Sequence, residues 1–172
     1  MAGAVGAVDS PPAVAALAVA ALEEAGEPMK AREFLNKLRH EEIVAAIQAA
    51  EKLTSGEIRV FISRNPVEDP VPAAQNQFVA LGMEKTRDRN GVLIFVAPRA
   101  HKFAVIGDVA VHARCGEEFW TELAREMSSH FRKSEFTAGI VHGVRKAGEL
   151  LAAHFPRRPG DTNELSDQVE TG

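Results

Sequence analysis

Four oxygen-bearing side chains lie beside predicted strands: Glu57, Asp88, Asn90 and Asp108. Carboxylate and amide oxygens are the ligands that hard divalent cations such as Ca²⁺ or Mg²⁺ prefer. Carboxylates that lie close together repel one another, and this repulsion raises their affinity for a cation. The four residues therefore predict a metal site wherever the fold brings them together, although the sequence contains no EF-hand pattern.

The elements around these residues predict an α/β fold, a three-layer α/β/α sandwich with a small mixed sheet and helices on both faces. A helix joins the first two strands, so these should be parallel with a right-handed crossover. The third strand follows the second after a short turn and should pair with it as an antiparallel hairpin. The predicted helices are 40–53, 73–83, 117–133 and 136–155, and the predicted strands are 57–63, 90–98 and 102–107.

This topology brings three strand ends to one rim of the sheet. The amino-terminal ends of the two parallel strands lie at the same edge, and the carboxyl-terminal end of the antiparallel third strand returns to it. The four candidate metal ligands are therefore expected to converge in a groove there. The other predicted groove residues are Arg89, Gly91, Glu117 and Glu118, with His112 and Arg114 in the loop 108–116 that would fold over the rim.

The same residue types also serve in turns and caps, which gives a plain structural alternative. Asp88 would then be a turn residue, and Asn90 would support the backbone at Gly91. Asp108 would cap the hairpin, and Glu117 would meet the positive end of a helix dipole.

A competing location lies at the opposite edge of the sheet. Ligands of open α/β sheets usually bind at the carboxyl-terminal edge of the parallel strands. That edge has no carboxylate close to a strand end, so it is the less favoured position for a cation. The polar residues that it offers are Ser63, Arg64, Asn65, Arg99 and His101.

Composition divides the 172 residues into a domain with two tails. The predicted domain covers 30–156, between an Ala-rich, flexible N-terminal tail at 1–29 and a disordered acidic tail at 157–172. The apolar stretch 13–22 is too short to span a bilayer and lacks the positive start of a secretory signal, so a loosely attached or disordered helix and a cytoplasmic location are expected.

Of the 24 acidic residues, four lie in 1–29, so 30–172 carries equal numbers of acidic and basic side chains. This balance argues against nucleic acid as a partner.

Motifs for catalysis are absent. There is no GxSxG elbow and no glycine-rich phosphate loop. His112 and Cys115 lack the second pair of ligands that a structural zinc site needs. The sequence therefore shows no pair of a nucleophile and a base.

Several stretches resemble the TPM domain, a family named from thylakoid-lumen, photosystem II repair and nematode receptor-accessory proteins. They are SGEIRVFI, RNGVLIFVAP, KFAVIGD, GEEFW and FRKSEFTAGIVHGV, and the resemblance spans about 29–155. The likeness is to short bacterial forms without an export signal. The resemblance implies the three-layer sandwich. It also implies a rim groove that binds calcium in some members, acid-phosphatase activity in some, and an accessory or repair role in others.

This chain departs from the family pattern at two places. The family has an acidic residue directly before Asn-Gly, where this chain has Arg89, with Asp88 one position earlier. The family's glycine-rich loop after the third strand is replaced here by VAVHARC. We hypothesise that Arg89 supplies the positive charge that a cation supplies elsewhere.

Two functions are consistent with these residues. The first is a binding or accessory module whose rim groove recognises a protein or a small anionic ligand, with or without a divalent cation. The second is a metal-assisted acid phosphatase. In that mechanism Asp88, Asn90, Asp108 and Glu57 would hold a cation that polarises phosphate and activates water. Arg114 or His112 would contact the phosphoryl oxygens.

Overall fold

A computed structural model describes residues 30–172 and the backbone of residues 14–21. It contains one mixed sheet of five strands in the order β1-β4-β3-β2-β5. The parallel pair is β2 (Glu57–Ile62) and β3 (Gly91–Ala97), and β4 (Lys102–Asp108) is antiparallel to β3. The predicted parallel pair and antiparallel hairpin are therefore confirmed.

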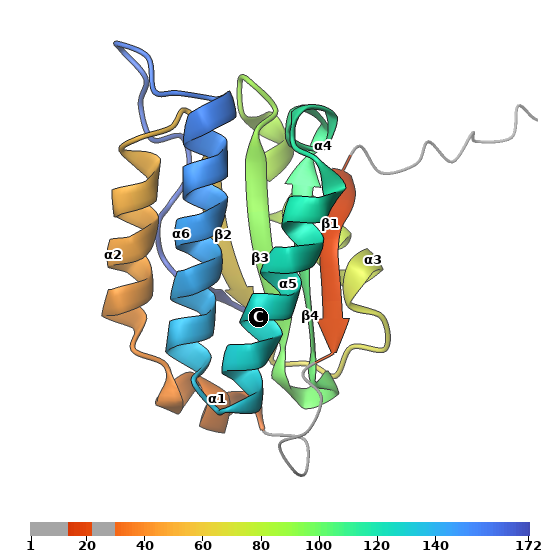
Figure 1. The fold of residues 1–172 in the computed structure, drawn as a ribbon. Helices are drawn as coiled ribbons and strands as arrows, with labels where there is room; N and C mark the ends of the chain where they lie inside the picture. The colour runs from red at the N-terminus through yellow and green to blue at the C-terminus, as the bar shows by residue number, and fades with distance from the viewer. Residues whose placement is uncertain (1–13, 22–29) are drawn as a thin grey trace, which may run out of the picture.

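Helices cover both faces of the sheet (Figure 1). One face carries α2 (His40–Glu51), α5 (Glu117–Arg132) and α6 (Phe136–His154), and α1 (Ala31–Lys37) closes its lower end. The other face carries α3 (Pro70–Ala80), followed by the short 3₁₀ turn η1 (Met83–Lys85). Every residue of β2 and β3 is buried, as expected of strands covered on both sides. The predicted three-layer sandwich is thus confirmed.

Local sequence explains where several of these elements begin and end. Helix α3 begins at Pro70, earlier than predicted, because the Asp69 side chain caps it by accepting a hydrogen bond from the Val71 N–H at 3.0 Å. The 3₁₀ turn η2 (Pro98–Ala100) links β3 to β4, and His101 adopts a left-handed conformation with φ of 51°. The segment 109–114, predicted as a loop, is instead the short helix α4 (Val109–Arg114).

The prediction of a helical or disordered stretch at 13–22 is wrong for residues 14–21. They form β1 (Val14–Ala21), an edge strand antiparallel to β4. An open edge of β4 would leave a row of unpaired backbone groups, and pairing them outweighs the helix preference of alanine. The remainder of the predicted N-terminal tail, 1–13 and 22–29, lies outside the described residues.

The prediction of a disordered tail at 157–172 is also wrong. This C-terminal segment crosses the rim, runs along β2 and ends in β5 (Glu170–Thr171), which pairs with β2 in parallel. The Arg59 guanidinium donates to Glu170 at 3.0 Å and to the Ser166 carbonyl at 3.1 Å. Leu165 also packs against the core cluster on the α3 face. A few specific contacts thus hold a segment whose composition is mostly polar.

Helices α2 and α6 pack tightly against each other at Gly148. A β-carbon there would lie 2.6 Å from the Ala50 β-carbon, which is fixed to the α2 backbone. We expect Gly148→Ala to lower the free energy of unfolding by about 1–3 kcal/mol through overpacking, as measured by chemical denaturation. Gly116→Ala is the control, because nothing lies within 4 Å of its β-carbon position. Equal stability of the two variants would contradict the packing argument.

Candidate functional site

The three strand ends meet at one rim of the sheet. Glu57 pairs in register with Gly91, and Val92 pairs with Gly107, which directly precedes Asp108. The elements thus place the predicted groove residues at the same edge. The contacts of the individual side chains decide what this edge can bind.

Arg89 and Asp108 form a two-pronged ion pair. Arg89 Nε donates to Asp108 Oδ2 and Arg89 Nη2 donates to Asp108 Oδ1, each at 2.8 Å. Asp108 is fully buried, whereas the Arg89 side chain is 37% exposed. Asp108 Oδ1 also caps α4 by accepting from the Val109 N–H at 2.7 Å. Both oxygens of this predicted metal ligand are therefore engaged.

The backbone of Arg89 has an unusual conformation. Its φ is 51°, in the left-handed region that residues with a β-carbon rarely adopt. The Arg89 carbonyl accepts a hydrogen bond from the Ala110 N–H at 3.2 Å. The Asp108 contacts raise the pKa of Arg89. The segment before β3 is thereby attached to α4 by both backbone and side chain.

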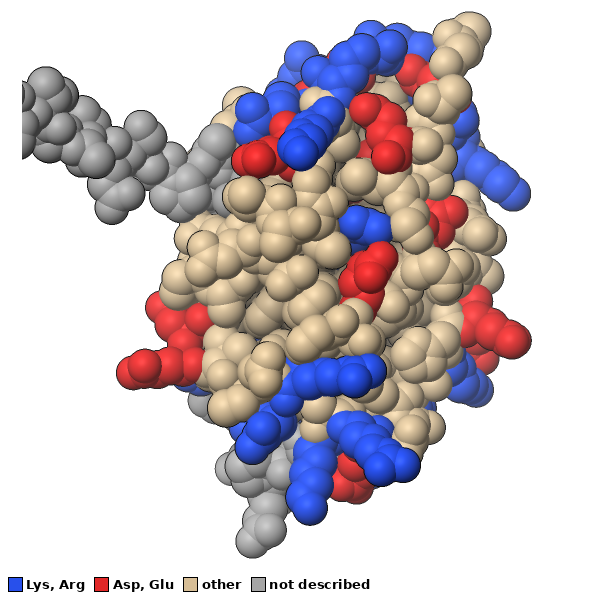
Figure 2. All heavy atoms as spheres, turned by 180° about the vertical axis from the view of Figure 1, so that it is seen from behind, with Lys and Arg blue, Asp and Glu red and all other residues tan. Residues whose placement is uncertain are grey.

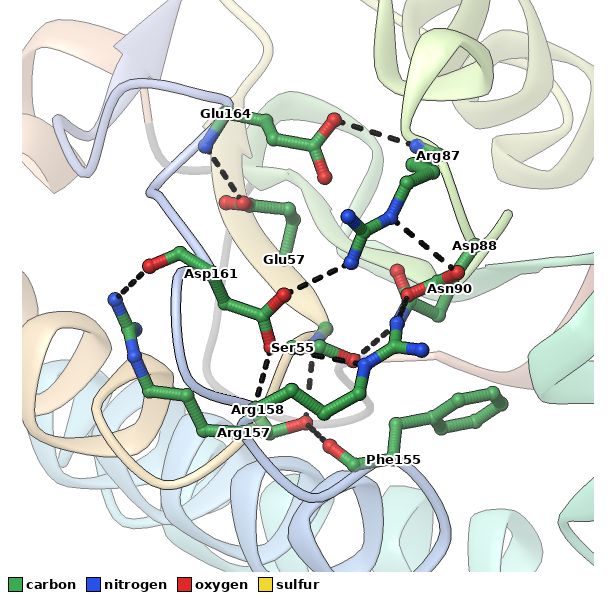
Figure 3. Close-up of polar contacts among 12 residues, drawn as sticks. Ser55, Glu57, Arg87, Asp88, Asn90, Phe155, Arg157, Arg158, Asp161 and Glu164 are labelled. Atoms are coloured by element: carbon green, nitrogen blue, oxygen red, sulfur yellow. Dashed lines mark hydrogen bonds and ion pairs between the residues drawn. The ribbon is translucent and has the colours of Figure 1, made fainter.

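Asp88 belongs to a second network, made with the C-terminal segment (Figure 3). Its carboxylate pairs with Arg158, and Arg87 Nε lies 3.7 Å from it. Arg87 in turn donates to Asp161 Oδ1 at 2.8 Å. The Arg158 backbone N–H donates to Asp161 Oδ2 at 2.6 Å and holds the pKa of Asp161 below its usual value.

Glu57 and Asn90 lie deeper under the rim. Glu57 is buried and accepts from the Glu164 N–H at 2.8 Å, and burial is the main cause that raises its pKa. Asn90 is fully buried, and its Nδ2 donates to Ser55 Oγ at 3.2 Å. Among the described residues its Oδ1 has no hydrogen-bond partner. Gly91 contributes to packing, since a β-carbon there would lie 3.3 Å from the Phe78 ring.

These contacts do not fit a Ca²⁺ or Mg²⁺ ion at the four predicted ligands. Asp108 is held by Arg89, and Asp88 is held by Arg158. Over residues 14–21 and 30–172, no group of three His, Cys, Asp or Glu side chains could hold a metal ion. Arg89 brings a positive charge to the Asp108 carboxylate, and whether this charge takes the place of a cation stays a hypothesis.

Four predicted residues remain, and they behave differently from one another: His112, Arg114, Glu117 and Glu118. His112, Glu117 and Glu118 are exposed, and no described contact joins their side chains to the rim. Arg114 reaches back toward α6, and its guanidinium carbon lies 4.9 Å from the centre of the Phe155 ring. Of the four, only Arg114 lines a pocket at the rim.

That pocket has a volume of about 220 Å³ and is called the rim pocket below. Its lining residues are Ser55, Asp88, Arg114, His154, Phe155, Pro156 and Arg158. Ser55, His154 and Arg158 are not among the predicted groove residues, and Arg158 lies in the segment 157–172 that was predicted to be disordered. The one signal in the sequence was the Thr54-Ser55-Gly56 break between α2 and β2, where the Ser55 N–H donates to the Phe155 carbonyl at 2.9 Å.

Comparison with known proteins decides the family. The family model described as the TPM domain matches residues 29–150. The chain belongs to the TPM domain family. The matched part of this TPM domain ends before the segment 157–172, so Arg158, Asp161 and Glu164 lie beyond it.

One solved structure is similar over most of its length. It is the NMR structure of BA42 protein from the psychrophilic bacterium Bizionia argentinensis, with 37% sequence identity and a TM-score of 0.72. The alignment covers 78% of this TPM domain protein and 95% of the other chain. None of the curated proteins compared with the chain matches it. In the part of the chain that the structure describes, no helix combines the length and apolar character needed to cross a membrane.

Proposed function

We propose that this TPM domain is a binding module that holds an anionic group, a carboxylate or a phosphate, in the rim pocket. The observation that carries the proposal is the charge balance of the pocket. Arg158 is neutralised by Asp88, but Arg114 forms no ion pair with any described residue and instead lies over the Phe155 ring. An incoming anion would therefore meet an uncompensated guanidinium, which binds carboxylate and phosphate well.

Ser55 adds a directed donor to this charge. Its Oγ accepts a hydrogen bond from Asn90 Nδ2, so the hydroxyl proton remains free to donate. Buried Asn90 thus orients Ser55 toward a ligand without touching the ligand itself. This assigns to Asn90 a positioning role in the groove in place of the metal-ligand role expected from the sequence.

The phosphatase alternative has less support. Hydrolysis would need a bound cation or an activated nucleophile. Of the predicted cation ligands, Asp88 and Asp108 are paired with arginines, and Glu57 accepts a hydrogen bond from the Glu164 N–H. Ser55 and His154 both line the rim pocket, but no described hydrogen bond joins them as a nucleophile–base pair. The proposal therefore includes binding of a phosphate group and excludes its cleavage.

An amide NMR titration with sodium phosphate and with sodium citrate tests the proposal. We expect shifts at Ser55, Arg114 and Phe155, and we expect Arg114→Gln to weaken binding by about tenfold, the loss of one charge-assisted hydrogen bond. Arg132→Gln, which removes an exposed charge on α5, is the matched control. Unchanged affinity in Arg114→Gln would overturn the proposal. The phosphatase alternative would be favoured if the protein hydrolysed p-nitrophenyl phosphate and if a chelator and Asp108→Asn each abolished this activity.

A further inference from the structure

A second, larger pocket lies at the opposite edge of the sheet. Strand β2 ends at Ile62 and β3 ends at Ala97, and Arg64 and Arg99 each follow two residues later. The two arginines therefore lie at the carboxyl-terminal edge of the parallel pair, where open α/β sheets usually bind ligands. This pocket, called the basic pocket below, has a volume of about 830 Å³. That volume is within the range of small-molecule sites.

Positive side chains from separate parts of the chain line the basic pocket. Lys30 and Arg32 come from the start of α1, and Arg64 and Arg99 come from the two strand ends. His40, the first residue of α2, also lines it, and among the described residues no carboxylate side chain does. Figure 2 shows the corresponding gathering of Lys and Arg at the lower end of the molecule, with little Asp or Glu between them.

The charge balance of the basic pocket distinguishes it from the rim. At the rim, Arg87, Arg89 and Arg158 each face a carboxylate, whereas Arg114 does not. In the basic pocket, none of the four Lys and Arg side chains forms an ion pair with a described residue. The Arg64 guanidinium has a neutral partner, the Thr171 hydroxyl at 3.3 Å. Four like charges around one cavity repel one another, and an anion that enters the cavity relieves this repulsion.

We propose that the basic pocket binds a small soluble molecule that carries at least two phosphate groups. A single phosphate would leave most of the positive charge uncompensated, whereas a polyphosphate spans several cations at once. Leu35 supplies an apolar wall, against which a non-polar part of the ligand can pack. The described residues that line the pocket include no carboxylate side chain, which disfavours a cation at this edge and suits a polyanion. The rim pocket lies at the other edge, so this inference does not depend on the function proposed there.

Calorimetric titration of the full chain with sodium tripolyphosphate tests the inference, at about 0.15 M salt to suppress weak surface binding. We expect Arg64→Gln and Arg99→Gln each to weaken binding by about tenfold or more. The control is Arg145→Gln, which removes an exposed arginine on α6, and it should change the affinity by no more than about twofold. Sodium orthophosphate should bind more weakly than tripolyphosphate in the same pocket.

Two further arms decide between sources of the phosphate. The inference is supported if Arg64→Gln and Arg99→Gln weaken the binding of tripolyphosphate while Arg145→Gln leaves it unchanged. Binding to phosphatidylglycerol vesicles without binding to tripolyphosphate would overturn it and indicate a lipid surface. Equal loss of affinity for tripolyphosphate in all three variants would show a general effect of charge and would overturn the inference. The absence of tripolyphosphate binding to the unmodified chain would also overturn it. All three residues are exposed, so the variants should unfold at the temperature of the unmodified chain.

Discussion

Replacing Arg89 with alanine is expected to lower the free energy of unfolding by about 2–4 kcal/mol. Removing one partner of a buried ion pair leaves the other charge buried and unpaired, which typically costs about 3–5 kcal/mol. Asp108 is fully buried, but Arg89 is 37% exposed, so water partly screens the pair and the loss should be somewhat smaller. Denaturation by guanidinium chloride, followed by circular dichroism, measures this loss.

Two comparisons separate the ion pair from other effects of the substitution. The double variant Arg89→Ala with Asp108→Asn should recover part of the lost stability, because the amide carries no unpaired charge. Arg125→Ala removes an exposed arginine paired with Glu122 and should cost no more than about 1 kcal/mol. Equal losses in Arg89→Ala and Arg125→Ala would contradict the role of the buried pair.

The Arg89 pair also gives a test of the hypothesis that this guanidinium takes the place of a cation. Arg89→Asp would put a second carboxylate next to Asp108, so the variant should bind calcium more tightly than the unmodified chain. Calorimetric titration with calcium chloride measures the difference. No gain in calcium affinity would contradict this hypothesis.

The convergence of strand ends at the rim followed from simple rules applied to the sequence. A helix between 57–63 and 90–98 implied a parallel pair, and the short turn after the second strand implied a hairpin. These two statements were sufficient to place Glu57, Asn90 and Asp108 at one edge. They could not give the partner of each carboxylate, because a shift of one residue decides whether Asp88 or Arg89 faces Asp108.

The parts that sequence reasoning missed have weak local signals. Helix α4 has only six residues, too few for a periodic pattern, and it depends on the cap that Asp108 supplies. The C-terminal segment is mostly polar, and its contacts use groups that exist only once the sheet is assembled, such as the edge of β2. Strand β1 likewise forms against the free edge of β4. In each case a tertiary partner outweighs local preference.

Raising the pH from about 5 to about 9 is expected to destabilise the protein through Glu51. Burial, and next the Asp167 carboxyl, raise the pKa of Glu51 from 4.5 to about 10. The buried Glu57 carboxyl adds to this effect, and Glu51 Oε1 accepts from the Ile58 N–H at 2.8 Å. We therefore expect Glu51 to be protonated in the folded protein at neutral pH and ionised in the unfolded chain.

The sign follows from proton linkage. The folded state binds the proton more tightly, so the contribution of Glu51 to stability is complete below pH 4.5 and is lost as the pH rises toward about 10. One proton changes the free energy of unfolding by at most about 1.4 kcal/mol per pH unit within this window. The C-terminal segment should respond first, because Asp167 lies beside Glu51 and Arg157 donates to the Glu51 carbonyl at 2.9 Å.

Glu51→Gln isolates this effect. The amide oxygen can still accept from the Ile58 N–H, and the neutral side chain resembles the protonated glutamic acid. We expect the variant to be more stable than the unmodified chain at pH 9 and nearly equal to it at pH 5, as measured by thermal unfolding at both pH values. The difference between the two proteins cancels the titrating groups that do not interact with Glu51, so a constant difference across this range would show that Glu51 is already ionised in the folded state. The stability difference should instead grow with pH, and the amides of 157–172 should exchange at a lower pH than those of the rest of the chain. Together these results would show that the proton on Glu51 stabilises the C-terminal segment at the rim.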